Sequence, residues 1–110
     1  MDAWQAIAEP SRRRILLLLA AEDLAAGEIA AHFTATRSAV SQHLAVLRAA
    51  GLVQVVAEGR RRVYRIDRRA MEQVRGDIEA FWTSELAAVA REAFRLADNA
   101  RSTDDERNAG

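Results

Sequence analysis

The segment that most constrains the fold is residues 27–53, which read GEIAAHFTATRSAVSQHLAVLRAAGLV. Apolar side chains recur every three or four positions over residues 27–33 and 37–50, which predicts two short helices. Thr36 is a good N-cap for the second helix, and Gly51 follows that helix as its C′ residue. Two helices joined by so tight a turn are typical of a helix-turn-helix, whose second helix enters a DNA groove.

After Gly51 the apolar pattern changes from helical to extended. Residues 52–56 and 62–66 predict two strands, and residues 57–61 form the tip between them, with Glu58-Gly59 at the turn. Tyr64 and Ile66 are expected to pack this hairpin against the body of the domain. A hairpin directly after a helix-turn-helix is a wing.

Helices flank this unit on both sides. Residues 4–8 predict a short helix, and Pro10 begins a second one that runs to about Ala21, with an apolar centre that predicts burial on most sides. A long helix is expected from Arg68 to about Asn99. Its apolar positions are spaced by threes and fours: Met71, Val74, Ile78, Phe81, Trp82, Leu86, Val89, Ala93 and Leu96.

The expected architecture is mainly α with a small β-hairpin: a winged helix-turn-helix of about five helices and a two-stranded wing. We expect residues 1–100 to form this domain, including its N- and C-terminal dimerisation helices, and residues 101–110 to be a flexible polar tail. Half of the residues are apolar, but 24 of them are alanine, which contributes little burial energy. So small an effective core favours a homodimer.

Charge is distributed unevenly although the net charge is zero. Residues 37–69 contain eight arginines and two acids, whereas residues 76–110 contain four arginines and eight acids. A phosphate backbone responds to local charge, so the central segment can bind DNA despite the neutral total.

Two groups of side chains are the candidate DNA contacts. Val40, Leu44 and Leu47 lie on one face of the second helix of the motif and anchor it, which leaves the polar face for DNA. The expected contacts from that face are Thr36, Arg37, Ser38, Ser41 and Gln42, and those from the wing are Arg60, Arg61 and Arg62. Arginine pairs with guanine and glutamine with adenine, but adjacent strand residues face opposite ways, so the three wing arginines cannot all point together.

The sequence lacks the residues that disulfides, metal sites or catalysis would need. The absence of cysteine excludes disulfides, thiolate metal sites and thiol nucleophiles. His32 and His43 lie on different helices, so neither a metal site nor a catalytic constellation is expected, and His43 is interpreted as structural. Residues 12–14, three arginines before an apolar run, imitate a secretory signal, but the run is short, and we interpret the arginines as structural. No segment is long enough to span a membrane, and a cytoplasmic location is expected.

The strings EPSRRRILLLL, GEIAAHF, SAVSQHLAVLRAAGLV and EGRRRVYRID resemble the ArsR-type winged-helix repressors of bacteria over about residues 4–82. The resemblance implies a homodimer that binds an imperfect palindrome near a promoter, with its first and last helices at the dimer interface. The interface residues so implied are Trp4, Ile7, Met71, Val74, Ile78, Phe81, Trp82, Leu86 and Val89. It also assigns base reading to Arg37, Ser38, Ser41 and Gln42.

The chain departs from the metal-sensing members of that family. It has no cysteines, and although Asp77 is available, no histidine follows His43, so neither known type of metal site can be assembled. It is therefore similar to the metal-independent, autorepressor-like branch, with no cofactor. Release from DNA by a small molecule, by a protein partner or by dilution of the repressor all stay open.

These observations predict a dimeric, sequence-specific DNA-binding repressor that is not an enzyme. The alternatives are a winged-helix scaffold for protein interactions that does not read DNA, and a regulator that responds to a small molecule.

Overall fold

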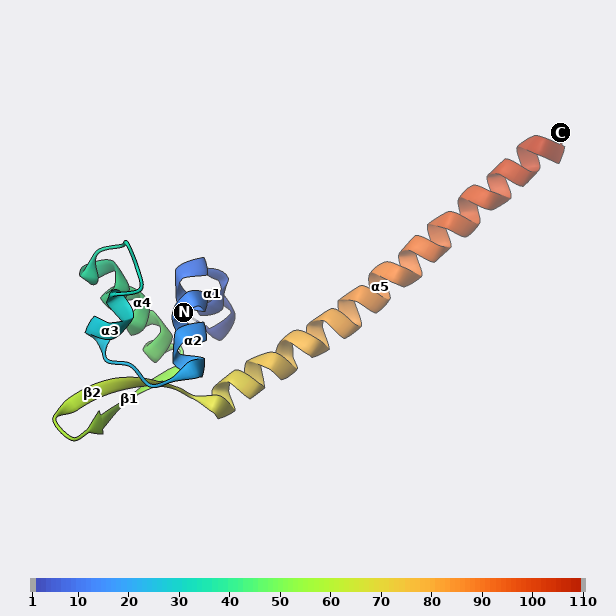
Figure 1. Ribbon diagram of the computed structural model, residues 1–110. Coiled ribbons are helices and arrows are strands. Elements are labelled where there is room, and N and C mark those ends of the chain that lie inside the picture. Colours follow the sequence, from blue (N-terminus) through green and yellow to red (C-terminus); the bar gives the residue numbers. More distant parts are fainter. Residues whose placement is uncertain (1, 110) are drawn as a thin grey trace. The chain divides into compact units, whose positions relative to one another are not determined.

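The computed structural model describes residues 2–109, with side chains described over residues 2–102. The described residues form five helices and one antiparallel hairpin, as the sequence predicted (Figure 1). In chain order they are α1 (Ala3–Ala8), α2 (Pro10–Ala21), α3 (Ala26–Ala30), α4 (Arg37–Ala49), β1 (Val53–Glu58), β2 (Arg61–Ile66) and α5 (Arg68–Ala109).

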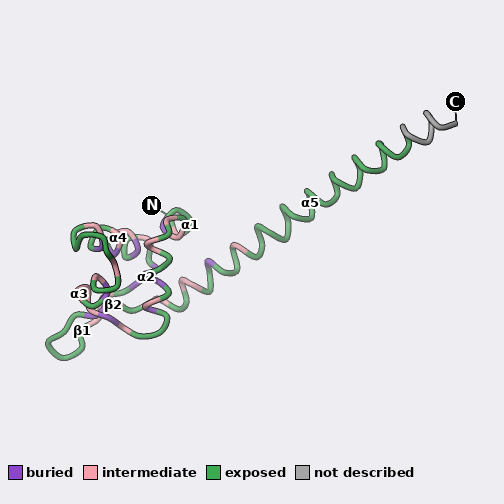
Figure 2. Tube along the Cα trace, turned by 45° about the horizontal axis from the view of Figure 1, so that its top comes forward, coloured by how far each residue is buried: buried purple, intermediate pink, exposed green. Residues whose placement is uncertain are grey.

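The chain divides into two compact units, Met1–Val74 and Arg75–Gly110. The first unit contains α1 to α4, the hairpin and the beginning of α5, and every residue described as buried lies in it (Figure 2). Its largest fully buried side chains come from α2, α3, α4, the loop after α4 and β2: Ile15, Ile29, Val40, Leu44, Leu47, Leu52 and Val63. The second unit is the remainder of α5.

Helix α2 begins as predicted. Pro10 occupies its first turn, and the Glu9 carboxylate accepts a hydrogen bond from the Arg12 N–H at 2.9 Å. Its apolar centre is buried on most sides, as expected: Ile15, Leu16 and Leu19 are buried, and only Leu17 of residues 15–19 is exposed, at 73%. Five consecutive residues at 100° each go around the whole helix, so one of residues 15–19 must point away from the core.

The ends of α3 and α4 show how the turn between them is fixed. Helix α3 ends at Ala30, three residues earlier than predicted, and Ala25 supplies no capping side chain. Instead the Glu28 carboxylate accepts a hydrogen bond from the Ala25 N–H at 2.9 Å. Helix α4 begins as predicted, because the Thr36 hydroxyl accepts a hydrogen bond from the Ala39 N–H at 3.1 Å.

Gly51 ends α4 as the C′ residue with φ of 79°. Its N–H donates to the Arg48 carbonyl, and the Leu52 N–H donates to the Leu47 carbonyl, both at 3.0 Å. These two bonds form a Schellman motif, which satisfies the last carbonyls of the helix and turns the chain toward β1.

The hairpin is longer and tighter than predicted. Glu58 pairs with Arg61, so the tip is a two-residue turn instead of the expected five residues. Only Gly59, the first of the two turn residues, has a positive φ, of 64°, which is the pattern of a type II′ turn. On the other side of β2, Tyr64 exchanges two backbone hydrogen bonds with Leu24, so β2 lies between β1 and the loop before α3.

Helix α5 begins where Asp67 accepts a hydrogen bond from the Ala70 N–H at 3.0 Å. It runs to Ala109, about ten residues beyond the predicted end near Asn99, and Gly76 does not interrupt it. Most of the residues predicted as a flexible polar tail, 101–110, lie outside the described side chains, and their flexibility stays a prediction. Among the described residues, no helix combines the length and hydrophobicity needed to cross a bilayer.

Candidate nucleic-acid interface

Helix α4 has one buried and one exposed face. Val40, Leu44 and Leu47 are at most 2% exposed and hold the helix against α2 and the hairpin. Ser38, Ser41 and Gln42, the residues predicted to contact DNA, are all exposed on this helix. The polar face is therefore open to a ligand while the helix itself is fixed in the core.

The N-terminus of α4 contributes Thr36 and Arg37. The Thr36 hydroxyl accepts the capping bond, which leaves its hydrogen free to donate to a phosphate. The Arg37 side chain folds back toward the start of α3, where its Nη2 atom lies 3.0 Å from the position that a Cβ on Gly27 would occupy.

The three wing arginines differ in their surroundings. Arg61 forms an ion pair with Glu28, and Arg65 on the same strand face forms one with Asp23 at 2.7 Å. The bond to Asp23 raises the pKa of the Arg65 guanidinium. Arg62 lies on the opposite face of β2, with Tyr64, and Arg60 lies in the turn.

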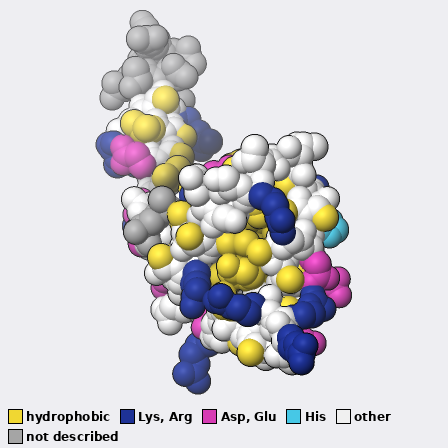
Figure 3. Space-filling model, turned by 90° about the vertical axis from the view of Figure 1, so that its left-hand side faces the viewer, with side chains coloured by type: hydrophobic (Ala, Val, Ile, Leu, Met, Phe, Trp, Pro, Cys, Tyr) yellow, Lys and Arg dark blue, Asp and Glu magenta, His cyan; other side chains and the backbone are white. Residues whose placement is uncertain are grey.

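The arginines that form no ion pair with a described side chain include Arg37, Arg48, Arg60 and Arg62. All four come from α4 or from the wing. On the face that carries α3, α4 and the hairpin, arginine side chains surround an apolar patch, with acidic side chains mainly at the margin (Figure 3). This face combines uncompensated positive charge with an exposed polar helix, as a DNA-binding surface requires.

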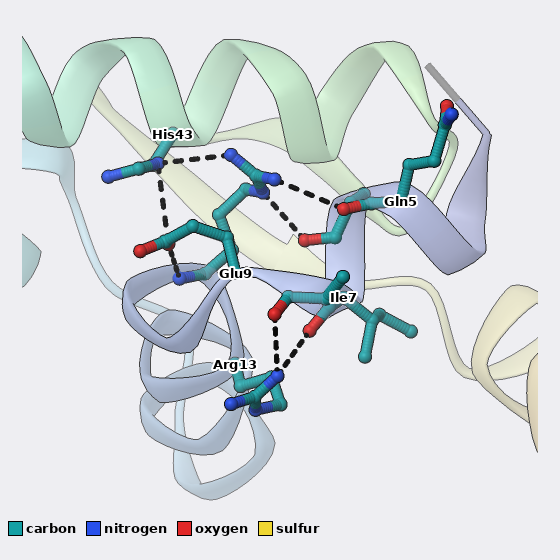
Figure 4. A network of polar contacts seen from close by, with 8 residues as sticks. Gln5, Ile7, Glu9, Arg13 and His43 are labelled. Atoms are coloured by element: carbon teal, nitrogen blue, oxygen red, sulfur yellow. Dashed lines mark hydrogen bonds and ion pairs between the residues drawn. The ribbon is translucent and has the colours of Figure 1, made fainter.

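The arginines that begin α2 have structural roles, as predicted. Arg12 donates to the carbonyls of Ala6 and Gln5, and Arg13 donates to those of Ile7 and Ala8 (Figure 4). They satisfy the last carbonyls of α1, which that short helix cannot satisfy itself. The third arginine of the run, Arg14, donates to the His32 carbonyl at 2.8 Å and lies 4.7 Å from the centre of the Phe33 ring.

His43 joins the same network on the buried side of α4. Its Nδ1 atom lies 3.4 Å from the Arg12 guanidinium and 3.8 Å from the Glu9 carboxylate (Figure 4). Burial alone would raise the pKa of Glu9, but the N–H groups of Arg12 and Ser11 and the nearby positive charges outweigh it and lower the pKa. In the described part of the chain, no three acids or histidines lie close enough to hold a metal ion.

The residues assigned to a dimer interface divide by unit. In the first unit Val74 is 5% exposed in a single chain, whereas Trp4 is 43% exposed. Ile7 and Met71 of the first unit are half-buried, and so is Ile78 at the beginning of the second unit. On α5 beyond residue 78 the assigned side chains are between 46% and 61% exposed: Phe81, Trp82, Leu86 and Val89. Phe94 and Leu96, which were not assigned, are also exposed at 72% and 54%.

Sequence reasoning selected Ser41 as a DNA contact but did not identify the strip between α4 and the wing to which it belongs. A groove there is lined by Ser41, Ala45, Arg48, Ala49 and Tyr64. The helical spacing of Ser41, Ala45 and Arg48 was a usable signal, because it places them on one face. The position of Tyr64 beside them depends on the pairing of the hairpin, which the sequence alone does not show.

The exposed polar helix, the turn before it and the basic hairpin after it define a winged helix-turn-helix protein with a DNA-binding face. The family model described as "Bacterial regulatory protein, arsR family" matches residues 9–55. The HTH-type transcriptional regulator Rv2034 of Mycobacterium tuberculosis is 45% identical over 81% of this chain and 83% of its own length. The chain belongs to the ArsR family of DNA-binding transcriptional regulators.

Other relatives agree with this assignment. The transcriptional repressor SdpR of Bacillus subtilis is 40% identical over 47% of this chain and 58% of its own length. A crystal structure described as a "possible transcriptional regulator for arsenical resistance" superposes with a TM-score of 0.71 and 42% identity, covering 84% of this chain and 96% of that one. Members of this family regulate transcription, so the chain is not an enzyme.

Proposed function

We propose that this chain is a homodimeric, metal-independent repressor that binds a palindromic operator. The observation that carries the proposal is the exposed polar face of α4 beside four arginines that no described acid neutralises. The similarity to the repressor SdpR supports repression as the outcome of binding. In a symmetric dimer, two α4 helices would enter major grooves about 34–36 Å apart.

Base reading is assigned to the exposed residues of α4, and the wing contacts to its arginines. Ser38, Ser41 and Gln42 face outward with no competing contact to the core. Arg60 and Arg62 would contact phosphates or the minor groove without rearrangement, whereas Arg61 would first have to leave Glu28. Thr36 and Arg37 would contribute at the start of the helix.

A gel shift with the DNA upstream of its own gene, against a scrambled competitor, tests this assignment. Ser41→Ala and Gln42→Ala should each weaken specific binding and leave the circular dichroism spectrum unchanged. Ser102→Ala, which removes an exposed serine from α5, is the matched control and should bind like the parent. If Ser41→Ala and Gln42→Ala both bind like the parent, the base-reading assignment fails.

Dimerisation is assigned to α1 and α5. Trp82, Leu86 and Val89 are spaced by four and three residues and expose a continuous apolar strip on one side of α5. Leu86→Asp should convert the dimer to monomer in analytical ultracentrifugation and abolish operator binding. Ser84→Asp, on the opposite side of the helix, should stay dimeric; a dimeric Leu86→Asp protein would contradict the assigned interface.

Metal independence follows from the side chains available. His32 lies in the turn after α3 and His43 lies in α4; among the described residues neither belongs to a cluster that could hold a metal ion, and the sequence has no cysteine. Operator affinity should therefore be the same in a chelator and after addition of zinc. A change of tenfold or more with either treatment would refute this part of the proposal.

A further inference from the structure

The groove between α4 and the wing is lined by both polar and apolar side chains. Ser41, Ala45, Arg48 and Ala49 recur at intervals of four, three and one, so they lie along one face of α4. Tyr64 of β2 forms the other wall. The groove thus carries a hydroxyl on each wall and a guanidinium, with two methyl groups between them.

The walls of this groove are fixed by backbone hydrogen bonds. Tyr64 accepts from Leu24 at 3.2 Å and donates to it at 2.7 Å, in addition to its pairing with Val55 on β1. Arg48 lies in the last turn of α4, where the Gly51 N–H holds its carbonyl. The backbone segments that carry Tyr64 and Arg48 therefore cannot move apart unless these hydrogen bonds break.

The charges in and beside the groove favour the binding of an anion. Arg48 has no ion-pair partner among the described residues, and none of the lining residues is acidic. Arg62 shares the strand face of Tyr64 two residues toward the wing tip, which adds a second positive charge along the same line.

The position of the groove identifies the anion. A recognition helix lies in a major groove and a wing reaches the adjacent minor groove, so the surface between them must face the sugar–phosphate backbone that separates the two grooves. We propose that this groove holds one backbone unit of the operator: Arg48 and the Tyr64 hydroxyl bind the phosphate, and the deoxyribose lies over Ala45 and Ala49. The inference rests on the proposed DNA-binding function and adds residues to it.

Such a contact fixes the register of α4 on the duplex without reading a base. Ser41 belongs both to the groove and to the base-reading face, so the bound phosphate lies next to the side chains that discriminate sequence. Arg48 and Tyr64 are therefore positioning residues, and their loss should weaken specific and non-specific binding by the same factor.

The experiment uses fluorescence anisotropy with the full chain, an operator selected by the protein from random duplexes, and a random duplex of the same length. Arg48→Gln should lower affinity for both DNAs by about tenfold or more, and should reduce the slope of log K against log salt by about 0.9 for each lost contact. Tyr64→Phe should lower both affinities less and keep the slope, because it removes a hydrogen bond and no charge. Gln42→Ala should instead reduce the ratio between the two affinities.

Two further comparisons separate this site from a general effect of charge. Ala49→Leu should weaken binding because it fills the groove, whereas Ala20→Leu on the exposed side of α2 should not. The two substitutions are comparable because leucine is a good helix former at both positions. Arg91→Gln on α5 is the matched control for loss of one exposed arginine. Thermal unfolding of every variant confirms that the comparison is between folded proteins.

Single methylphosphonate substitutions in the operator locate the contact. At one phosphate in each half-site the parent should lose affinity on substitution, whereas Arg48→Gln should lose none there. If Arg48→Gln and Tyr64→Phe bind like the parent with an unchanged salt slope, while Gln42→Ala loses specificity, the groove assignment is overturned and the proposed function stands. If the parent binds no duplex in the selection or in the anisotropy assay, the proposed function itself fails.

Discussion

Gly51 and Gly76 offer a test of whether backbone conformation alone decides the effect of adding a methyl group. At both positions a Cβ would meet no atom within 4 Å, so neither substitution creates a clash. Gly51 has φ of 79°, while Gly76 lies within the α5 helix. Gly51→Ala and Gly76→Ala should therefore change stability in opposite directions.

The magnitudes follow from the two conformations. An L-residue in the left-handed region destabilises the folded state by about 1–2 kcal/mol. Alanine also restricts the unfolded chain, which stabilises the protein by about 0.4–1 kcal/mol. Gly51→Ala should thus destabilise the domain by about 1 kcal/mol. Gly76→Ala should stabilise the helix by about 0.5–1 kcal/mol, because alanine is the better helix former.

Thermal and urea unfolding at one protein concentration, followed by far-UV circular dichroism, measure both effects. For a domain of this size, about 1 kcal/mol corresponds to a shift in Tm of about 4–8 °C. Gly51→Asn is the informative control, because asparagine tolerates positive φ and should lose less stability than alanine. Equal losses for Gly51→Ala and Gly51→Asn, or a stabilised Gly51→Ala, would refute the reasoning.

Two more perturbations follow from the ion pairs and caps. Glu28→Gln keeps an oxygen that can cap α3 but removes the ion pair with Arg61. DNA affinity at low salt should therefore rise, while the free energy of unfolding should fall by less than about 1 kcal/mol. Glu22→Gln, at another exposed glutamate, is the control. The Ala70 N–H and the Gln54 amide lower the pKa of Asp67, so the unfolded chain binds the proton more readily. The stability that Asp67 contributes should be present at neutral pH and be lost as the pH falls through its folded-state pKa. Asp67→Asn, which retains a capping oxygen, should flatten that acid limb of the unfolding curve; a limb as steep as the parent's would contradict this.

The elements were predictable where the signal is local. The spacing of Val40, Leu44 and Leu47 identified the buried face of α4, and Thr36 and Gly51 marked its two ends. Pro10 marked the start of α2 for the same reason. In each case the residues that decide the structure lie within one or two turns of one another.

Features that depend on distant partners were not predictable. The two-residue hairpin tip was missed for a different reason: Glu58 and Arg61 are only three residues apart, but the apolar pattern does not reveal how far the strand pairing continues. Arg61 looked equivalent to its neighbours until α3 brought Glu28 to it. Leu17 looked like a core residue, but no other element of the described chain covers its side of α2.

The three attachments of β2 to the body also bear on how the protein responds to the shape of DNA. Arg61 with Glu28, Arg65 with Asp23 and Tyr64 with Leu24 hold the wing at a set distance from α3. A DNA-binding protein whose recognition helix and wing are held at a fixed distance loses little conformational entropy on binding. It cannot, however, adapt to a duplex whose groove widths differ. Sequences whose minor groove already has the matching width would then be preferred even at base pairs that no side chain touches.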